Sequence, residues 1–172
     1  MDYKLIYSDR KSISASVKGG VLTVRAPRGV KPSVIESFLL KHRAWIDKHL
    51  EKARKKEDLF SALSEEEIKK LKKEARVYLI QKMEYFSNIM GLRYGRITIT
   101  SAKTRFGSCS SEGNISFSYR LMLYPEAARE YVVVHELAHL VEMNHSERFY
   151  KIVEAILPDY KRRKALLSVP ET

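Results

Sequence analysis

The segment 125–143, PEAAREYVVVHELAHLVEM, decides how the rest of the chain is interpreted. Pro125 and the Glu-Ala-Ala that follows it favour the start of a helix, because proline and acidic residues suit the first helical turn. Val134, Leu137 and Val141 then recur at helical spacing and supply one apolar face. Although Tyr-Val-Val-Val alone is also typical of a strand, the segment predicts an amphipathic helix that runs to about residue 143.

Within this helix, the motif His135-Glu136-Leu137-Ala138-His139 places two histidines four residues apart. On a helix that spacing brings both imidazoles to one face, so that one ion takes a nitrogen from each. Glu136 projects beside such an ion, where its carboxylate can take a proton from a water that the metal activates. The motif therefore predicts a zinc site with Glu136 as the catalytic general base.

A third metal ligand is expected soon after the motif, and the candidates are His145, Glu142, Glu147 and Glu154. His145 lies six residues after His139, the separation found in metzincins. Metzincins have a glycine midway, where this chain has Glu142, and no methionine follows His145 to form their Met-turn. The sequence thus favours His145 as the third ligand but excludes a metzincin. Three protein ligands leave one position open, as a catalytic zinc site requires.

The composition of the 172 residues is that of a globular protein, with 44% hydrophobic and 31% charged residues. The lone cysteine, Cys109, excludes an internal disulfide and a cysteine-based zinc knuckle, and it suits a reducing compartment. The N-terminal sequence MDYKLIYSDRK has charges where a signal peptide has its apolar region. No apolar run approaches the roughly 18 residues of a membrane span. We therefore expect a cytoplasmic protein without a membrane partner.

The net charge of +11 is explained either by a merely solvated basic surface, which we favour, or by a surface that binds anionic partners. Lysine and arginine are spread through residues 41–56, 69–82 and 161–164, a distribution that would attract nucleic acids, nucleotides or acidic proteins. Arg105 is a candidate for binding an anionic substrate or orienting a carboxylate, although it could equally be a solvated loop charge. Cys109 is better explained as a small residue packed near a glycine turn than as a nucleophile.

The first part of the chain, residues 1–58, is predicted to be a β-hairpin unit followed by a connecting helix. Alternating residues flank Gly19-Gly20, a hairpin signal. Ser33 is the expected cap of a helix over roughly 34–56. The charge-rich stretch 52–58 is the expected hinge.

The second part, residues 59–172, is predicted to be an α+β domain. Ser64 and Glu67 form a capping-box pattern that opens a helix over about 65–90. Strands are expected near 96–101 and 114–119, separated by a turn-rich loop over 103–113. A further helix is expected to begin near Ser146, which can act as its N-cap, and the final basic segment is expected to be helical too. We expect an antiparallel sheet packed against the helix that carries the His-Glu-x-x-His motif.

These motifs resemble the YgjP-like family of small predicted metal-dependent hydrolases, which are related to the SprT-like and WLM zincins. The resemblance is carried by Arg105-Phe106-Gly107-Ser108-Cys109-Ser110, by the segment Tyr131–Leu140, by Asn144-His145-Ser146 and by Phe149. It covers the C-terminal half strongly, with Phe106 where the family usually has tryptophan.

The resemblance implies a zincin-like, minigluzincin-like core. It maps His135, His139 and His145 onto the family's zinc ligands and Glu136 onto its general base. It also implies that a strand near 114–119 forms the edge above the metal, where a peptide substrate would align by β-augmentation.

Three functions follow from these features. The first is a zinc-dependent metallopeptidase acting on peptides or proteins. The second is a metal-dependent nucleotide phosphohydrolase or pyrophosphatase, in which the same activated water attacks phosphorus. The third is a basic nucleic-acid-binding module with a structural metal. The open metal site favours an enzyme, and the lack of a glycine-rich phosphate loop favours a peptidase over a phosphohydrolase.

Overall fold

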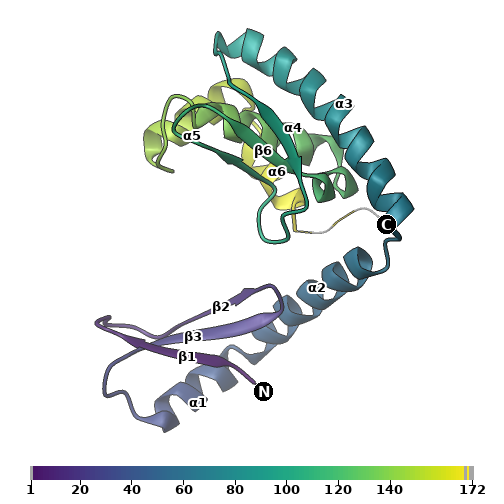
Figure 1. Cartoon of the computed structure of the whole chain (residues 1–172). Coiled ribbons are helices and arrows are strands. Elements are labelled where there is room, and N and C mark those ends of the chain that lie inside the picture. Colours follow the sequence, from purple (N-terminus) through teal and green to yellow (C-terminus); the bar gives the residue numbers. More distant parts are fainter. Residues whose placement is uncertain (1, 169, 171–172) are drawn as a thin grey trace. The chain divides into compact units, whose positions relative to one another are not determined.

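The computed structural model describes residues 2–168 and 170, which fall into two compact units, Met1–Ala62 and Leu63–Thr172. Figure 1 shows the N-terminal unit in purple and blue and the C-terminal unit in teal to yellow. No helix among the described residues is long and apolar enough to cross a membrane. Each unit contains one three-stranded sheet and its own hydrophobic core.

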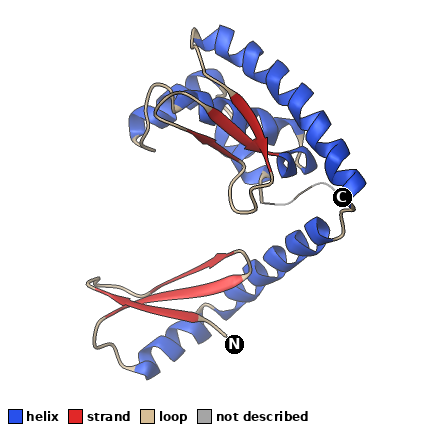
Figure 2. Cartoon of the chain, viewed as in Figure 1, coloured by secondary structure: helices blue, strands red, loops and turns tan. Residues whose placement is uncertain are grey.

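The N-terminal unit packs two helices on one face of its sheet (Figure 2). The elements are β1 (Lys4–Ser8), β2 (Ser14–Lys18), β3 (Val21–Pro27), α1 (Pro32–Lys41) and α2 (Arg43–Ser61). The predicted hairpin is present, because Gly19 and Gly20 join β2 to β3 with φ values of 54° and 74°. The buried core consists of Leu22, Val24, Ala26, Ile35 and Ile46.

The connecting helix differs from its prediction in three ways. It is two helices, since His42 departs from helical geometry with φ −103° and ψ 12°. No proline or glycine marks this break, so the sequence pattern does not indicate it. Lys31 rather than Ser33 is the N-cap, with Pro32 in the first turn. Residues 52–58, expected as a hinge, lie inside α2.

The C-terminal unit opens with its longest helix. Its elements are α3 (Glu65–Met90), β4 (Ile97–Thr100), β5 (Gly107–Cys109), β6 (Ile115–Ser118), a 3-10 turn (Tyr119–Leu123), α4 (Glu126–Ala138), α5 (Glu147–Ile156) and α6 (Tyr160–Leu166). The predicted capping box of α3 is present: Ser64 Oγ accepts from Glu67 N, and Glu67 accepts from Ser64 N. The helix ends at Gly91, whose φ of 64° gives the left-handed turn that favours glycine.

The α+β class is confirmed, but the C-terminal sheet is mixed rather than antiparallel throughout. Its order is β4-β6-β5; β6 is antiparallel to β5 and parallel to β4. After β4 the chain reverses through residues 101–106, and β6 then fills the space between the two earlier strands. The N-terminal sheet has the same arrangement, with β3 between β1 and β2. In both sheets the last strand in the sequence is the central one.

An ion-pair network joins three helices of the C-terminal unit. Glu130 on α4 pairs with Lys82 on α3 at 2.6 Å and with Arg163 on α6 at 2.7 Å. Arg163 also pairs with Asp159 at 2.6 Å. The side chains of Glu130, Lys82 and Arg163 are only 19–22% exposed. Because water screens these charges weakly, the network fixes α4 against its neighbours.

Replacing Glu130 by glutamine should lower the free energy of unfolding by about 2 kcal/mol, because two mostly buried cations each lose a charged partner. The matched control is Glu147→Gln on α5, whose ion pair with Lys151 is exposed and should contribute less than about 0.5 kcal/mol. Urea unfolding followed by circular dichroism measures both values. Equal losses in the two variants would contradict a stabilising role for the network.

Candidate metal centre

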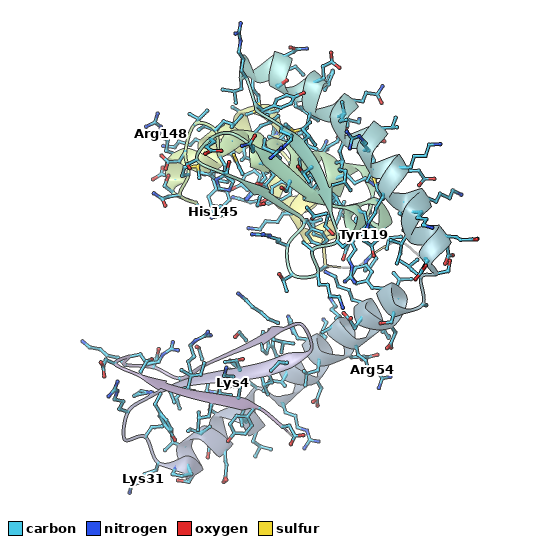
Figure 3. The ribbon with its side chains drawn as sticks, in the orientation of Figure 1. Lys4, Lys31, Arg54, Tyr119, His145 and Arg148 are labelled. Carbon is cyan, nitrogen blue, oxygen red and sulfur yellow. The ribbon has the colours of Figure 1, made fainter. Side chains whose placement is uncertain are left out.

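Three histidines converge at one end of α4. His135 lies in α4, His139 caps the end of that helix, and His145 stands just before the start of α5. The Nε2 atom of His135 is 3.2 Å from Nε2 of His139 and 3.0 Å from Nε2 of His145. Figure 3 shows His145 at the same end of the C-terminal unit as Arg148 on α5. The structure thus brings together the three histidines that the sequence singled out.

The spacing of the three nitrogens fits the ligands of one small ion. At a zinc–nitrogen distance of about 2.0–2.1 Å, tetrahedral ligands are about 3.3 Å apart. Burial, followed by the neighbouring His139 and His145, lowers the pKa of His135 to about 3, so that its ring is neutral at pH 7. Three imidazole nitrogens at this spacing suit zinc or another first-row transition ion. They do not suit magnesium or calcium, which take oxygen ligands.

Hydrogen bonds from outside the cluster orient two of the rings. Nδ1 of His139 lies 3.1 Å from the backbone oxygen of Glu142, which only accepts, so this nitrogen carries the proton and Nε2 keeps its lone pair. Tyr131, one turn before His135 on α4, places its Oη 3.3 Å from Nδ1 of His135. Both contacts turn the Nε2 atom of the ring toward the point where the three histidines converge. Metal-ligating histidines are usually oriented in this way.

The ring of Phe149 packs against all three imidazole rings. In the sequence, only the resemblance to the family points to this residue. Its fully buried ring lies 4.6–4.8 Å from the centroids of His135, His139 and His145. The local cause is the N-cap of α5, where Ser146 Oγ accepts from Phe149 N at 3.3 Å. The sequence predicts Ser146 as the cap of α5, but it does not predict that the ring of Phe149 points toward the histidines.

Glu136 stands beside the histidines and is buried, with 4% of its surface exposed. Among the described residues, the cluster of possible metal ligands contains the three histidines and not Glu136. Burial raises the pKa of Glu136 to about 8, and the positive charge of Arg105 acts in the opposite direction. Glu136 therefore lies beside the histidine cluster without belonging to it.

The strand next to this carboxylate is β5, not the strand predicted near 114–119. A Cβ atom added to Gly107 would overlap Oε1 of Glu136 and would lie 2.7 Å from its Cγ. β6, which covers most of the predicted edge strand, is central in the sheet, and β5 forms the edge. The sequence analysis assigned residues 103–113 to a loop because the strand Gly107–Cys109 is short and contains glycine, serine and cysteine.

The two remaining candidate functional residues, Arg105 and Cys109, lie next to and within β5. Arg105 is an exposed residue of the segment before β5, close enough for its charge to act on Glu136. Cys109 is partly buried in β5, and burial, followed by the charge of Glu136, raises the pKa of its thiol. A raised pKa keeps the sulfur protonated, which favours the structural interpretation of Cys109.

A family model described as YgjP-like, metallopeptidase domain, matches residues 11–70 and 57–169. Among solved structures, the chain is similar to that of the metallopeptidase zymogen of Pyrococcus abyssi abylysin, with 24% identity and a TM-score of 0.47. That similarity covers 55% of this chain and 99% of the other. No curated protein matches the chain.

Gly107→Ala should lower the free energy of unfolding by about 1–3 kcal/mol, because the added methyl group overlaps the Glu136 side chain, which cannot swing into solvent. Combining it with Glu136→Ala should relieve the overlap, so that the double variant is more stable than the sum of the two single losses predicts. Chemical unfolding of the four proteins measures this coupling. The control cycle pairs Gly107→Ala with Glu147→Ala on α5, and we expect additivity there; additivity in the first cycle would refute the close approach.

Proposed function

This chain belongs to the YgjP-like family of metallopeptidase domains, and we propose that it is a zinc-dependent peptidase in which Glu136 is the general base. As a member of that family it is a metal-dependent hydrolase. The observation that carries the finer proposal is the convergence of three imidazole nitrogens beside a buried carboxylate. A structural zinc site usually has four protein ligands, and three are found within the described part of the chain.

His135, His139 and His145 are the proposed zinc ligands. Their Nε2 atoms face one another at 3.0–3.2 Å for the two contacts with His135. When bound there, zinc supplies Lewis acidity, which lowers the pKa of a water molecule and polarises a substrate carbonyl. The protein contributes three imidazole rings, two of which are oriented by hydrogen bonds to Tyr131 and to the Glu142 backbone oxygen.

Glu136 is the proposed proton acceptor. It follows a ligand directly in the sequence, so it projects from α4 at the side of the metal site rather than into it. Its carboxylate would take a proton from the attacking water and return it to the leaving amine. The contact with Gly107 holds the side chain in place without a large neighbouring side chain.

The edge strand β5 is the proposed guide for the substrate. Because β5 is at the end of the sheet order, an extended peptide has access to its backbone and would add to the sheet as a further strand. Gly107, the first residue of β5, touches Glu136. A peptide aligned on this strand would therefore pass the proposed general base.

The zinc ligands can be tested by metal content. The purified protein should hold about one zinc ion per chain, and His145→Ala should lower the retained zinc at least about tenfold after dialysis against a weak chelator. The matched control is His49→Ala, because His49 belongs to the N-terminal unit and bonds to the Trp45 carbonyl oxygen at 2.7 Å. Mass spectrometry of the metal measures both. Similar zinc content in the two variants would refute this ligand set.

The catalytic role of Glu136 can be tested with an unfolded protein such as casein. Glu136→Gln should reduce zinc-dependent cleavage at least about 100-fold while zinc content stays unchanged, because the amide cannot accept the proton. Gel analysis and mass spectrometry of the fragments measure the rate and the bond. If the protein released phosphate from nucleotides and did not cleave casein, a phosphohydrolase function would replace the proposed peptidase function. If the protein bound DNA in a salt-sensitive way and showed no metal-dependent hydrolysis, it would be a nucleic-acid-binding module rather than a peptidase.

A further inference from the structure

A small cavity of about 90 Å³ lies beside β5 and is lined by a distinctive set of groups. Its walls contain four hydroxyl side chains and one guanidinium group, and no carboxylate; the lining residues are Thr100, Ala102, Arg105, Phe106, Gly107, Ser108, Ser116 and Ser118. On the same measure a single water needs about 10–15 Å³, so the cavity has room for a group of several heavy atoms.

Two of the hydroxyls hold the cavity together. Ser118 Oγ donates to the Ala102 oxygen at 2.8 Å, and Thr100 Oγ1 donates to the Phe117 oxygen at 3.3 Å. Ala102 N in turn donates to Thr100 Oγ1 at 3.4 Å. These bonds fix the segment 101–106 against the sheet, so the wall that carries Arg105 is anchored.

The other polar groups of the cavity are available to a ligand. Ser108 and Ser116 are cross-strand partners in β5 and β6, so both side chains lie on the same face of the sheet. Within residues 2–168 and 170, neither hydroxyl bonds to another residue and Arg105 forms no ion pair. Hydroxyl donors beside an unpaired guanidinium form a receptor for an anion, which arginine binds through two parallel hydrogen bonds.

The cavity adjoins the proposed reaction centre. Gly107 belongs to the cavity lining and also contacts Glu136. The charge of Arg105 reaches the same carboxylate. Since the side chains of an extended strand point alternately to opposite faces, a peptide on β5 that presents its backbone near Glu136 would turn a neighbouring side chain toward the Ser108 face.

We propose that Arg105, Ser108 and Ser116 form a subsite that binds an anionic side chain of the substrate close to the cleaved bond. The ligand is the carboxylate of aspartate or glutamate or the phosphate of a phosphorylated residue, which share the same recognition chemistry. The inference rests on the proposed peptidase function and adds a substrate class to it.

The first test uses a fluorogenic peptide that the zinc-loaded enzyme cleaves, with glutamate, glutamine or phosphoserine placed in turn at each position around the cleaved bond. At one position an acidic residue should raise kcat/KM about tenfold over glutamine, mainly through KM. Arg105→Gln and Ser116→Ala should weaken this preference, and Arg105→Lys should retain part of it. The ratio of glutamate to phosphoserine distinguishes the two ligands.

The matched control is Lys103→Gln, which removes the same charge from the same exposed segment outside the cavity lining. It should leave the preference unchanged. A preference that is absent in the wild type, or that survives Arg105→Gln, would overturn the subsite. Equal losses in Lys103→Gln and Arg105→Gln would also overturn it, because they would show a general effect of charge.

The second test does not depend on proteolysis. Inorganic phosphate and acetate are titrated separately into the isotope-labelled, zinc-loaded protein, and amide signals are followed by NMR. Signals of residues 105–108 and 116 should shift in the wild type and in Glu136→Gln but not in Arg105→Gln. If the signals shifted but no peptide were cleaved, the proposed peptidase function would be refuted and the anion site would be supported. Cleavage without these shifts would refute the anion site alone.

Discussion

The contact between α4 and β5 at Glu136 and Gly107 is the constraint on which the candidate site depends. A buried carboxylate needs a close neighbour that excludes water and yet leaves room for its side chain, and glycine is the residue that provides both. The same contact sets the distance between the edge strand and the helix that carries His135 and His139. The histidines of α4, the carboxylate and the strand edge are therefore positioned by one packing relationship.

A second relationship fixes the third histidine. α4 ends at Ala138, so the chain turns before His145 rather than continuing to about residue 143 as its apolar pattern predicted. Ser146 then starts α5, and the ring of Phe149 packs beneath all three imidazoles. The ion-pair network around Glu130 holds the other part of α4 against α3 and α6. Local caps and tertiary contacts together place nitrogens that are far apart in the extended chain.

The sequence predicted the parts of the structure that depend on local chemistry. The capping box at Ser64, the hairpin at Gly19-Gly20 and the cap at Ser146 are each specified by a few residues that are close together in the sequence. The convergence of the three histidines follows from helical spacing and the family pattern. The strand β5 was missed because it is only three residues long and begins with glycine, which is depleted in strands. Its pairing with β6 defines it as a strand. The break at His42 was also missed, because no proline or glycine marks it in the sequence.

The shared order of strands in the two sheets has a consequence for synthesis on the ribosome. In each sheet the first two strands do not pair with each other. The central strand, which pairs with both of them, emerges last from the ribosome. Neither sheet can close until that strand has left the exit tunnel, and the contacts it makes with the first strand are the more distant ones in sequence. In the C-terminal unit this order delays the pocket for Glu136 until β6 and α4 have both been made. The candidate site therefore cannot assemble in the nascent chain before β6, α4 and His145 have all been synthesised.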